Sequence, residues 1–142
     1  MIRFLIDSSA LWRLLRDKEL RTAWGEVIDA GVVGSCQPQR TEFKRSARSR
    51  AEHDAMSDMV ADLHPDAPVP KSAWQWIETA QHRLAENGRH KGLSVVELLV
   101  AATAAHHGLV VVHDDGDFET VAATVRDLRV RNVREVRDLP QG

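Results

Sequence analysis

Hydrophobic residues in this chain occur in short runs, which are separated by longer stretches of helical periodicity. These runs are rich in β-branched residues and occupy residues 2–6, 32–36 and 109–112. Such runs are typical of strands buried on both faces, which belong to parallel sheets with helices on either side. Residues 128–133 instead alternate apolar and polar side chains, so we expect an edge strand there.

Apolar residues spaced three and four apart predict the helices that connect these strands. The expected helices cover residues 10–15, 20–30, a segment that includes 41–45, 52–63, 72–87, 93–105 and 118–125. Residues 93–105 are apolar around most of the helix, with Glu97 as their only charge, so we expect this helix to be central. Strands that alternate with helices predict an α/β fold.

Acidic residues follow the ends of the predicted strands. Asp7 comes directly after the first strand, Asp115 and Asp117 come shortly after the third, and Glu42 lies a little beyond the second. Glu97 begins the central helix. Right-handed crossovers bring the carboxyl ends of parallel strands to one edge of a sheet, where ligands bind. We therefore expect these acids to meet at that edge.

Each of these acids also has an ordinary structural interpretation. Asp7 could cap the next helix, although either of the two serines that follow it could do so instead. Glu42 could complement a helix dipole, and Glu97 could close a capping box with the serine three residues before it. The aspartates after the third strand could likewise form a solvated turn that caps the following helix.

Several carboxylates in one pocket need a compensating cation, or some of them must stay protonated. Two unit charges about 4 Å apart repel by about 4 kcal/mol at an effective dielectric constant near 20. Oxygen ligands suit Mg²⁺ or Mn²⁺, and the single cysteine, Cys36, excludes a multi-cysteine zinc site. Cys36 ends an apolar run, so we expect a small buried residue there. A magnesium site leaves positions open for phosphate oxygens, and the pattern therefore indicates metal-dependent phosphodiester hydrolysis.

The segment 40–50 is locally basic. Arg40, Lys44 and Arg48 are spaced four apart and can form one stripe on a helix, with Arg45 next to it. Such a stripe is most often only solvated. Beside an acidic pocket, however, it would suit a polyanion whose phosphates must be held in place.

Length and charge add few constraints. The 142 residues fit one domain, residues 1–142, and the net charge of -2 averages local patches of opposite sign. The first apolar run reaches Asp7 too soon for a signal peptide, and no apolar segment approaches the roughly 20 residues that span a bilayer. We expect a cytoplasmic protein without membrane association.

Four motifs in order give this chain its resemblance to the PIN-domain ribonucleases, specifically the VapC-type toxins. They are Ile-Asp-Ser-Ser-Ala-Leu at 6–11, Thr-Glu-Phe at 41–43, the helix segment 94–104, and Val-His-Asp-Asp-Gly-Asp-Phe-Glu at 112–119. Their order, their spacing and the total length match over essentially the whole chain.

The resemblance assigns roles residue by residue. The acids expected to act in catalysis are Asp7, Glu42, Glu97, Asp115 and Asp117, of which Asp7, Glu42, Glu97 and Asp115 would hold metal and Asp117 would assist directly or through water. Asp114 falls at a position that varies in the family. Glu97 stands where the family usually has aspartate, and the longer side chain could retune metal occupancy or mark a less active member.

The same resemblance implies a three-layer α/β/α sandwich with a central parallel sheet, as a single PIN domain. It implies the toxin of a type II toxin–antitoxin system, an endoribonuclease dependent on Mg²⁺ or Mn²⁺. It further implies a homodimer and a VapB-like antitoxin whose C-terminal segment blocks the acidic pocket. With RNA as the substrate, the basic side chains expected to bind it are Arg40, Lys44, Arg45 and Arg48.

Two other functions fit parts of the pattern. A catalytically weak PIN fold could act mainly by binding RNA or an antitoxin, which the departure at Glu97 favours. A phosphatase of the haloacid-dehalogenase type could use Asp7 as a covalent nucleophile, but such enzymes require a second aspartate where this chain has Ser9.

Overall fold

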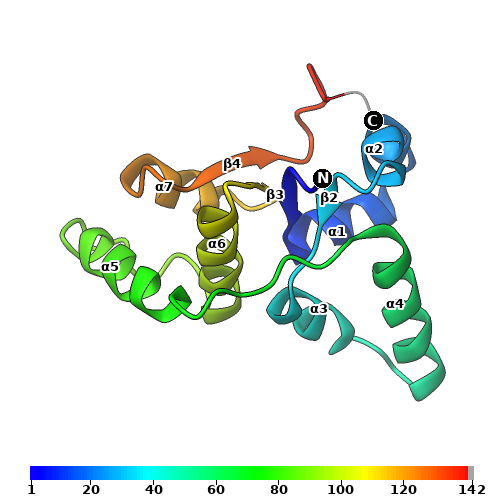
Figure 1. Cartoon of the computed structure of the whole chain (residues 1–142), viewed down its shortest axis with the longest axis horizontal. Helices are drawn as coiled ribbons and strands as arrows, with labels where there is room; N and C mark the ends of the chain where they lie inside the picture. The colour runs from blue at the N-terminus through cyan, green and yellow to red at the C-terminus, as the bar shows by residue number, and fades with distance from the viewer. Residues whose placement is uncertain (141–142) are drawn as a thin grey trace.

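The hydrophobic runs and the alternating segment form one parallel sheet in the computed structural model, which describes residues 1–140 (Figure 1). The strands are β1 (Phe4–Ile6), β2 (Val33–Gly34), β3 (Val110–His113) and β4 (Arg129–Asn132), in the order β2-β1-β3-β4. Every neighbouring pair is parallel. The last strand lies at an edge of the sheet, as its alternation predicts.

The second strand is shorter than its apolar run predicts. After Gly34 the backbone leaves β1, and Ser35 bonds instead to the connector that follows α4 (Arg50–Leu63). The Ser35 N–H donates to the carbonyl of Pro65 at 2.9 Å, and the Ala67 N–H donates to the carbonyl of Ser35 at 2.8 Å. At Ser35 the backbone therefore pairs with the connector after α4 and no longer with β1.

Seven helices in residues 1–140 cover the two faces of the sheet, which confirms the three-layer α/β/α sandwich. Besides α4 they are α1 (Ser8–Arg16), α2 (Lys18–Asp29), α3 (Gln37–Lys44), α5 (Ala73–Ala85), α6 (Val95–His107) and α7 (Gly116–Thr124). The helices α1 to α4 lie on one side, and α5, α6 and α7 lie on the other (Figure 1). None of the helices in this described part of the chain combines the length and apolar character needed to cross a bilayer.

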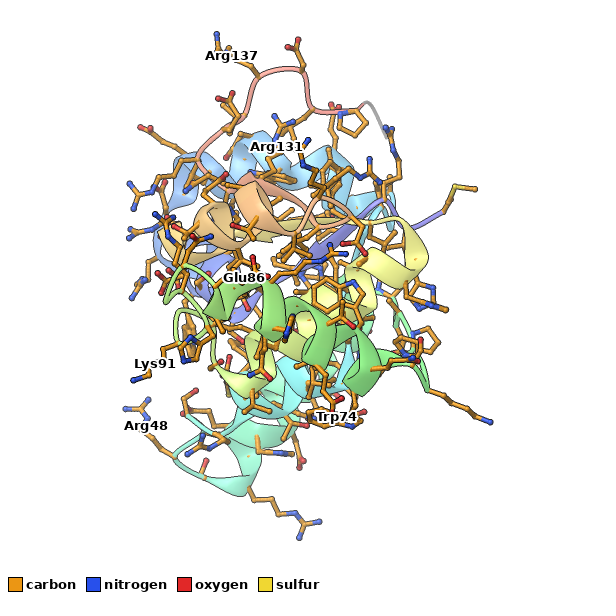
Figure 2. All side chains as sticks on the ribbon, turned by 90° about the vertical axis from the view of Figure 1, so that its left-hand side faces the viewer. Arg48, Trp74, Glu86, Lys91, Arg131 and Arg137 are labelled. Carbon is orange, nitrogen blue, oxygen red and sulfur yellow. The ribbon has the colours of Figure 1, made fainter. Side chains whose placement is uncertain are left out.

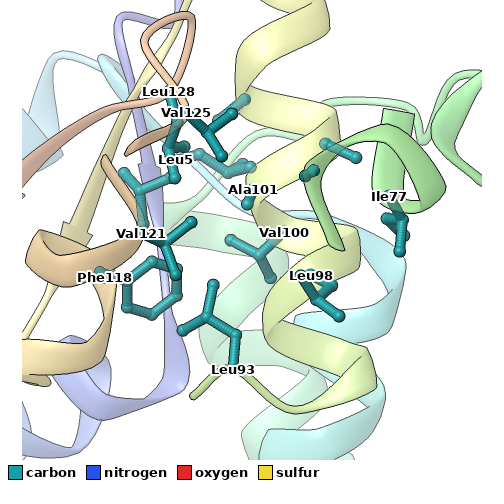
Figure 3. Close-up of a cluster of buried hydrophobic side chains, with 14 of the residues drawn as sticks. Leu5, Ile77, Leu93, Leu98, Val100, Ala101, Phe118, Val121, Val125 and Leu128 are labelled. Carbon is teal, nitrogen blue, oxygen red and sulfur yellow. The ribbon is translucent and has the colours of Figure 1, made fainter. Parts of the chain in front are cut away.

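Alternation along β1 divides the core between these two sides. Phe4 and Ile6 pack with α1 and α2, whereas Leu5 packs with α6. Figure 3 shows α6 between α5 on one side and α7 with the strands on the other, which confirms its expected central place. Cys36 is fully buried in this core, and burial raises the pKa of its thiol to about 11, as expected for a structural cysteine.

The strand order places the carboxyl ends of β1 and β3 side by side. From β1 the chain crosses to β2 on one side, while β3 lies on the other, so the point between β1 and β3 is a topological switch point. The Asp7 N–H donates to the carbonyl of Val112 at 2.9 Å, which joins the two strand ends directly. The acids that follow β1 and β3 are brought together in this way.

Candidate active site

Asp7 is both a helix cap and a buried acid with a free oxygen. It is the N-cap of α1, and its Oδ2 accepts the Ser9 N–H at 3.0 Å and the Ser9 hydroxyl at 2.6 Å. Only 2% of Asp7 is exposed, and its Oδ1 has no hydrogen-bond partner. The capping alternative is therefore correct for Asp7, and capping by one of the serines is wrong, because the helix already begins at Ser8. The cap uses one carboxylate oxygen and leaves the other available.

Asp115 and Asp117 lie at the start of α7. Asp115 is the N-cap of this helix, and its Oδ1 accepts the Asp117 N–H at 3.0 Å. Asp117 occupies the exposed first turn, where it also faces the loop before α6. A Cβ built on Gly92 would lie 3.8 Å from the Asp117 side chain, so the basic loop at 89–92 borders this acid.

Glu97 closes the capping box that the sequence allows. Its Oε1 accepts the Ser94 N–H at 2.9 Å, and the Ser94 hydroxyl accepts the Glu97 N–H at 3.2 Å. The box fixes the carboxylate at the amino-terminal end of α6. This placement brings Glu97 close enough to Asp7 and Asp115 for their charges to interact.

The three carboxylates Asp7, Glu97 and Asp115 form what we call the acidic pocket. Burial raises the pKa of Asp7, and the nearby Asp115 raises it further. Burial also raises the pKa of Glu97 to about 7, with further upward contributions from Asp7 and Asp115. Within residues 1–140, none of the three forms a salt bridge. The protein gathers negative charge here without supplying a cation.

Asp114, one residue before Asp115, has a different environment. Its carboxylate accepts from the guanidinium of Arg13 at 3.0 Å and from that of Arg134 at 2.9 Å. These hydrogen bonds, that of Arg134 first, hold the pKa of Asp114 below its usual value. Asp114 thus joins α1 to the segment after β4, which agrees with leaving it outside the set of active acids.

Glu42 lies on α3 and borders the same groove as Val96, the residue before Glu97. It is near the end of that helix rather than in its first turn, so complementing the amino-terminal dipole is not its role. Together with Arg45 it borders an apolar groove of about 510 Å³ between α3 and α6. The apolar lining comes from Pro38, Val69, Val96 and Leu99.

The expected basic stripe on one helix does not form. The helix α3 ends at Lys44, and Arg48 lies in the turn before α4, where it pairs with Glu52 at 3.3 Å. Arg40 pairs with Asp66 at 2.8 Å and donates to the Ser35 hydroxyl at 2.9 Å. The spacing of four residues would place these side chains on one face of a continuous helix. The helix is interrupted, however, because Ser49 caps a new helix, α4.

The donor set fits a divalent cation that takes few ligands from the protein. In residues 1–140, no group of three or more His, Cys, Asp and Glu side chains is arranged to hold an ion. Mg²⁺ is commonly held by one or two carboxylates, with waters and substrate phosphates completing its shell. The unpaired Oδ1 of Asp7, beside two further carboxylates, is a donor that such an ion would use.

Two polar residues of the site escaped sequence reasoning. The Ser9 hydroxyl donates to Asp7 and accepts the Asp114 N–H at 2.9 Å, so it ties the ends of β1 and β3 together. His113 is fully buried, and its Nδ1 accepts the Asp115 N–H at 3.1 Å. A serine two residues after an aspartate is a recognisable local turn signal, whereas His113 looked like part of an apolar strand.

Comparison with known proteins gives a consistent answer. The PIN domain family matches residues 4–124. Ribonuclease VapC6 of Mycobacterium tuberculosis is 57% identical over 107 residues, covering 75% of this chain and 84% of that protein. Ribonuclease VapC21 of the same species is 32% identical over 124 residues, covering 87% and 89%. The haloacid-dehalogenase interpretation is therefore wrong.

Solved structures support the fold. A VapBC structure from Salmonella typhimurium bound to DNA superposes with a TM-score of 0.75 at 17% identity, covering 94% of this chain and 99% of that chain. VapBC-1 from nontypeable Haemophilus influenzae superposes with a TM-score of 0.75 at 11% identity, covering 95% and 100%. The sequence matches and the shared fold agree with the acids at the switch point, and the chain belongs to the PIN-domain family, among the VapC ribonucleases.

Proposed function

We propose that this chain is the toxin of a type II toxin–antitoxin pair and hydrolyses phosphodiester bonds within RNA with the help of Mg²⁺ or Mn²⁺. The observation that carries the proposal is the acidic pocket, whose carboxylates have no cationic partner, and in which one buried Asp7 oxygen has no hydrogen bond. The relatives named VapC are ribonucleases, which supplies the substrate class. The cytoplasm is its proposed location.

The acids divide into two groups by their place in the fold. Asp7, Glu97 and Asp115 are near one another and would hold the cation directly or through bound water, and Glu42 on α3 is proposed as a further ligand. Asp117 would assist from the first turn of α7, directly or through water. A bound divalent cation would supply charge stabilisation at the scissile phosphate and lower the pKa of a water.

The capping contacts define what the chain itself contributes. Ser9 holds one oxygen of Asp7, and the capping box holds one oxygen of Glu97, so both carboxylates are fixed before any ligand arrives. Such preorganisation avoids reorganisation when RNA binds. The raised pKa of Glu97 also means that binding a cation would release a proton near neutral pH.

RNA would reach the acidic pocket past basic side chains. Lys44 and Arg45 lie near the end of α3, and Arg48 extends from the turn that follows. Figure 2 shows Arg48 and Lys91 extending on the same side of the molecule. Arg40 contributes less freely than the others, because its guanidinium already binds Asp66. Binding through phosphates should weaken steeply as salt increases.

A VapB-like antitoxin is the proposed protein partner. Several structural neighbours are VapBC assemblies, which supports an antitoxin for this chain as well. The apolar groove between α3 and α6, with Glu42 and Arg45 at its border, is the proposed place for a C-terminal antitoxin segment. A homodimer is also proposed, and Trp74, 59% exposed on α5, is an apolar side chain available for such an interface.

The decisive test is RNA cleavage by the purified chain with Mg²⁺, with Mn²⁺ and with a chelator. We expect cleavage only with added metal, and we expect Asp115→Asn to abolish it. Asp114→Asn is the matched control, since it removes the same charge one residue away while leaving the acidic pocket intact. Equal cleavage by the Asp115→Asn variant and the wild type would overturn the proposal.

The alternative is a binding module with weak catalysis. The observation that favours it is Glu97, whose carboxylate is engaged in the capping box and has a pKa of about 7, so it is only partly charged at neutral pH. The same assay separates the two functions. A binding module would retain RNA in a filter-binding measurement, with no metal-dependent cleavage that Asp115→Asn removes.

A further inference from the structure

His113 occupies a buried position directly behind the acidic pocket. It is the last residue of β3, and its side chain is fully shielded from solvent. Its ring stacks on Phe118, with ring centroids 5.3 Å apart and the planes 28° apart. Phe118 belongs to the core around α6 (Figure 3). Packing against Phe118 therefore fixes the orientation of the imidazole.

Both ring nitrogens of His113 have a partner, and the two partners differ in kind. Nδ1 lies 3.1 Å from the backbone nitrogen of Asp115, and Nε2 lies 3.0 Å from the carboxylate of Glu119. A backbone N–H can only donate, and an ionised carboxylate can only accept. The two contacts are satisfied together only by the neutral ring that carries its hydrogen on Nε2.

Glu119 is therefore the group that selects the ring tautomer. It lies one turn into α7 from Asp115, and its side chain is 57% exposed. With Glu119 accepting from Nε2, the Nδ1 lone pair faces the Asp115 N–H and holds the backbone at the N-cap of α7. Metal ligands in proteins are commonly oriented by a second layer of hydrogen bonds of this kind.

We infer that His113 is a positioning residue for Asp115, and that Glu119 sets the tautomer through which His113 acts. This inference rests on the proposed function, since it concerns the side chain proposed to hold the cation. His113 does not touch the substrate or the ion. It fixes the backbone from which the Asp115 carboxylate extends, and so it should set how strongly the chain binds the divalent cation.

The first test measures the Mg²⁺ concentration that half-saturates RNA cleavage. His113→Leu fills the buried position with an apolar side chain and removes the acceptor, so we expect the half-saturating concentration to rise about tenfold or more. His113→Asn offers a carbonyl oxygen close to the position of Nδ1 and should recover part of the loss. His64→Leu is the matched control, because His64 is also buried and its Nδ1 contacts the Val33 carbonyl at 3.0 Å. That control should leave the Mg²⁺ requirement unchanged within about twofold, whatever stability it loses.

The second test uses Glu119, whose exposed side chain can be changed without disturbing the core. Glu119→Leu should raise the Mg²⁺ requirement in the same direction as His113→Leu. Glu119→Gln can accept from Nε2 or donate to it, so it should give a smaller change. Nitrogen NMR of the imidazole rings should show the Nε2–H tautomer for His113 in the wild type, and a different tautomer mixture in Glu119→Leu.

The outcomes separate this inference from the proposed function. If Asp7→Asn and Asp115→Asn cleave RNA as the wild type does, the proposed function is wrong. If both abolish cleavage but His113→Leu and Glu119→Leu keep the wild-type Mg²⁺ requirement, only the positioning role is overturned. A wild-type His113 ring with its hydrogen on Nδ1 would also overturn it, because the Asp115 N–H would then have no acceptor.

Discussion

Two adjacent aspartates after β3 have opposite environments. Asp114 is neutralised by Arg13 and Arg134, and its pKa is held low. Asp115, the next residue, joins Asp7 and Glu97, whose pKa values are raised by burial and by mutual repulsion. Two aspartates adjacent in the sequence thus differ in role: Asp114 forms structural ion pairs, and Asp115 is part of an uncompensated acidic pocket.

This difference shows where the chain needs an external charge. For Asp114, which has a structural role, the fold supplies two arginines. In the acidic pocket the fold instead supplies hydrogen bonds from Ser9, Ser94 and the Asp117 N–H, and these leave the negative charge in place. Uncompensated buried charge lowers stability, so a site of this kind is typical of a place where function outweighs stability.

The largest expected effect is that of Asp7→Asn on catalysis. The amide can still accept the Ser9 N–H, so the cap of α1 should survive. Loss of the carboxylate should lower RNA cleavage by about 100-fold or more, as when other electrostatic stabilisers are removed from active sites. Initial rates of cleavage at saturating Mg²⁺ provide the measurement.

Asp7→Asn should also make the metal-free protein more stable, by about 1 kcal/mol, because it removes a buried like charge. Urea unfolding with a chelator at pH 8 measures this difference. Lower stability together with full activity would contradict the assignment of Asp7 to the acidic pocket.

Asp114→Asn should have the reverse effects. Losing its pairs with Arg13 and Arg134 should lower the free energy of unfolding by about 1 kcal/mol. The loss stays small because both arginines can turn to solvent. Cleavage should stay within a few-fold of the wild type.

The pH dependence of this loss can be derived from the lowered pKa of Asp114. The stabilisation is present above the unfolded pKa near 3.8, and it disappears as the pH falls through the lower folded value. Wild type and variant should therefore converge in stability at strongly acidic pH. A variant that keeps wild-type stability at pH 7 would show that the ion pairs contribute nothing.

The smallest expected effect on stability is that of Glu97→Gln, and it should depend on pH. The folded pKa of Glu97, about 7, exceeds the ordinary value of 4.5, so its favourable contribution is present at low pH and is lost as the pH rises through 7. Glutamine can keep the capping box without the charge. In a chelator, the variant should gain stability relative to the wild type between pH 5 and pH 8.

The size of this gain should not exceed about 1 kcal/mol, because solvent screens the partly exposed Glu97 carboxylate. Urea unfolding at several pH values provides the measurement. With added Mg²⁺, the difference in the free energy of unfolding between variant and wild type should no longer depend on pH. A relative stability that does not change with pH would show that Glu97 keeps its ordinary pKa.

The layers and the acid positions could be predicted from the sequence, because both follow from local pattern. Short apolar runs, one alternating segment and helical spacing identified the sheet and its helices, and the strand ends then located Asp7 and Asp115. The Ser94 and Glu97 capping box was also readable, since it depends on residues three apart. These features need no knowledge of which distant segments meet.

Other features depend on contacts between distant segments and could not be predicted. Arg13 and Asp114 are 101 positions apart, so the sequence cannot show that one aspartate is paired and its neighbour is not. Arg40 likewise pairs with Asp66 in the connector after α4, and the spacing of the basic residues cannot show this contact. The contacts of His113 depend on its side-chain rotamer and on where α7 begins, and periodicity specifies neither.

The most direct test of the acidic pocket is thermal unfolding with and without Mg²⁺ at pH 7.5, at matched ionic strength. A cation that binds only the folded chain must raise the unfolding temperature. We predict a rise that saturates with Mg²⁺ for the wild type and for Asp114→Asn, and no rise for Asp7→Asn. An identical response from the wild type and Asp7→Asn would contradict the account, because the carboxylates of the acidic pocket would then not be where the cation binds.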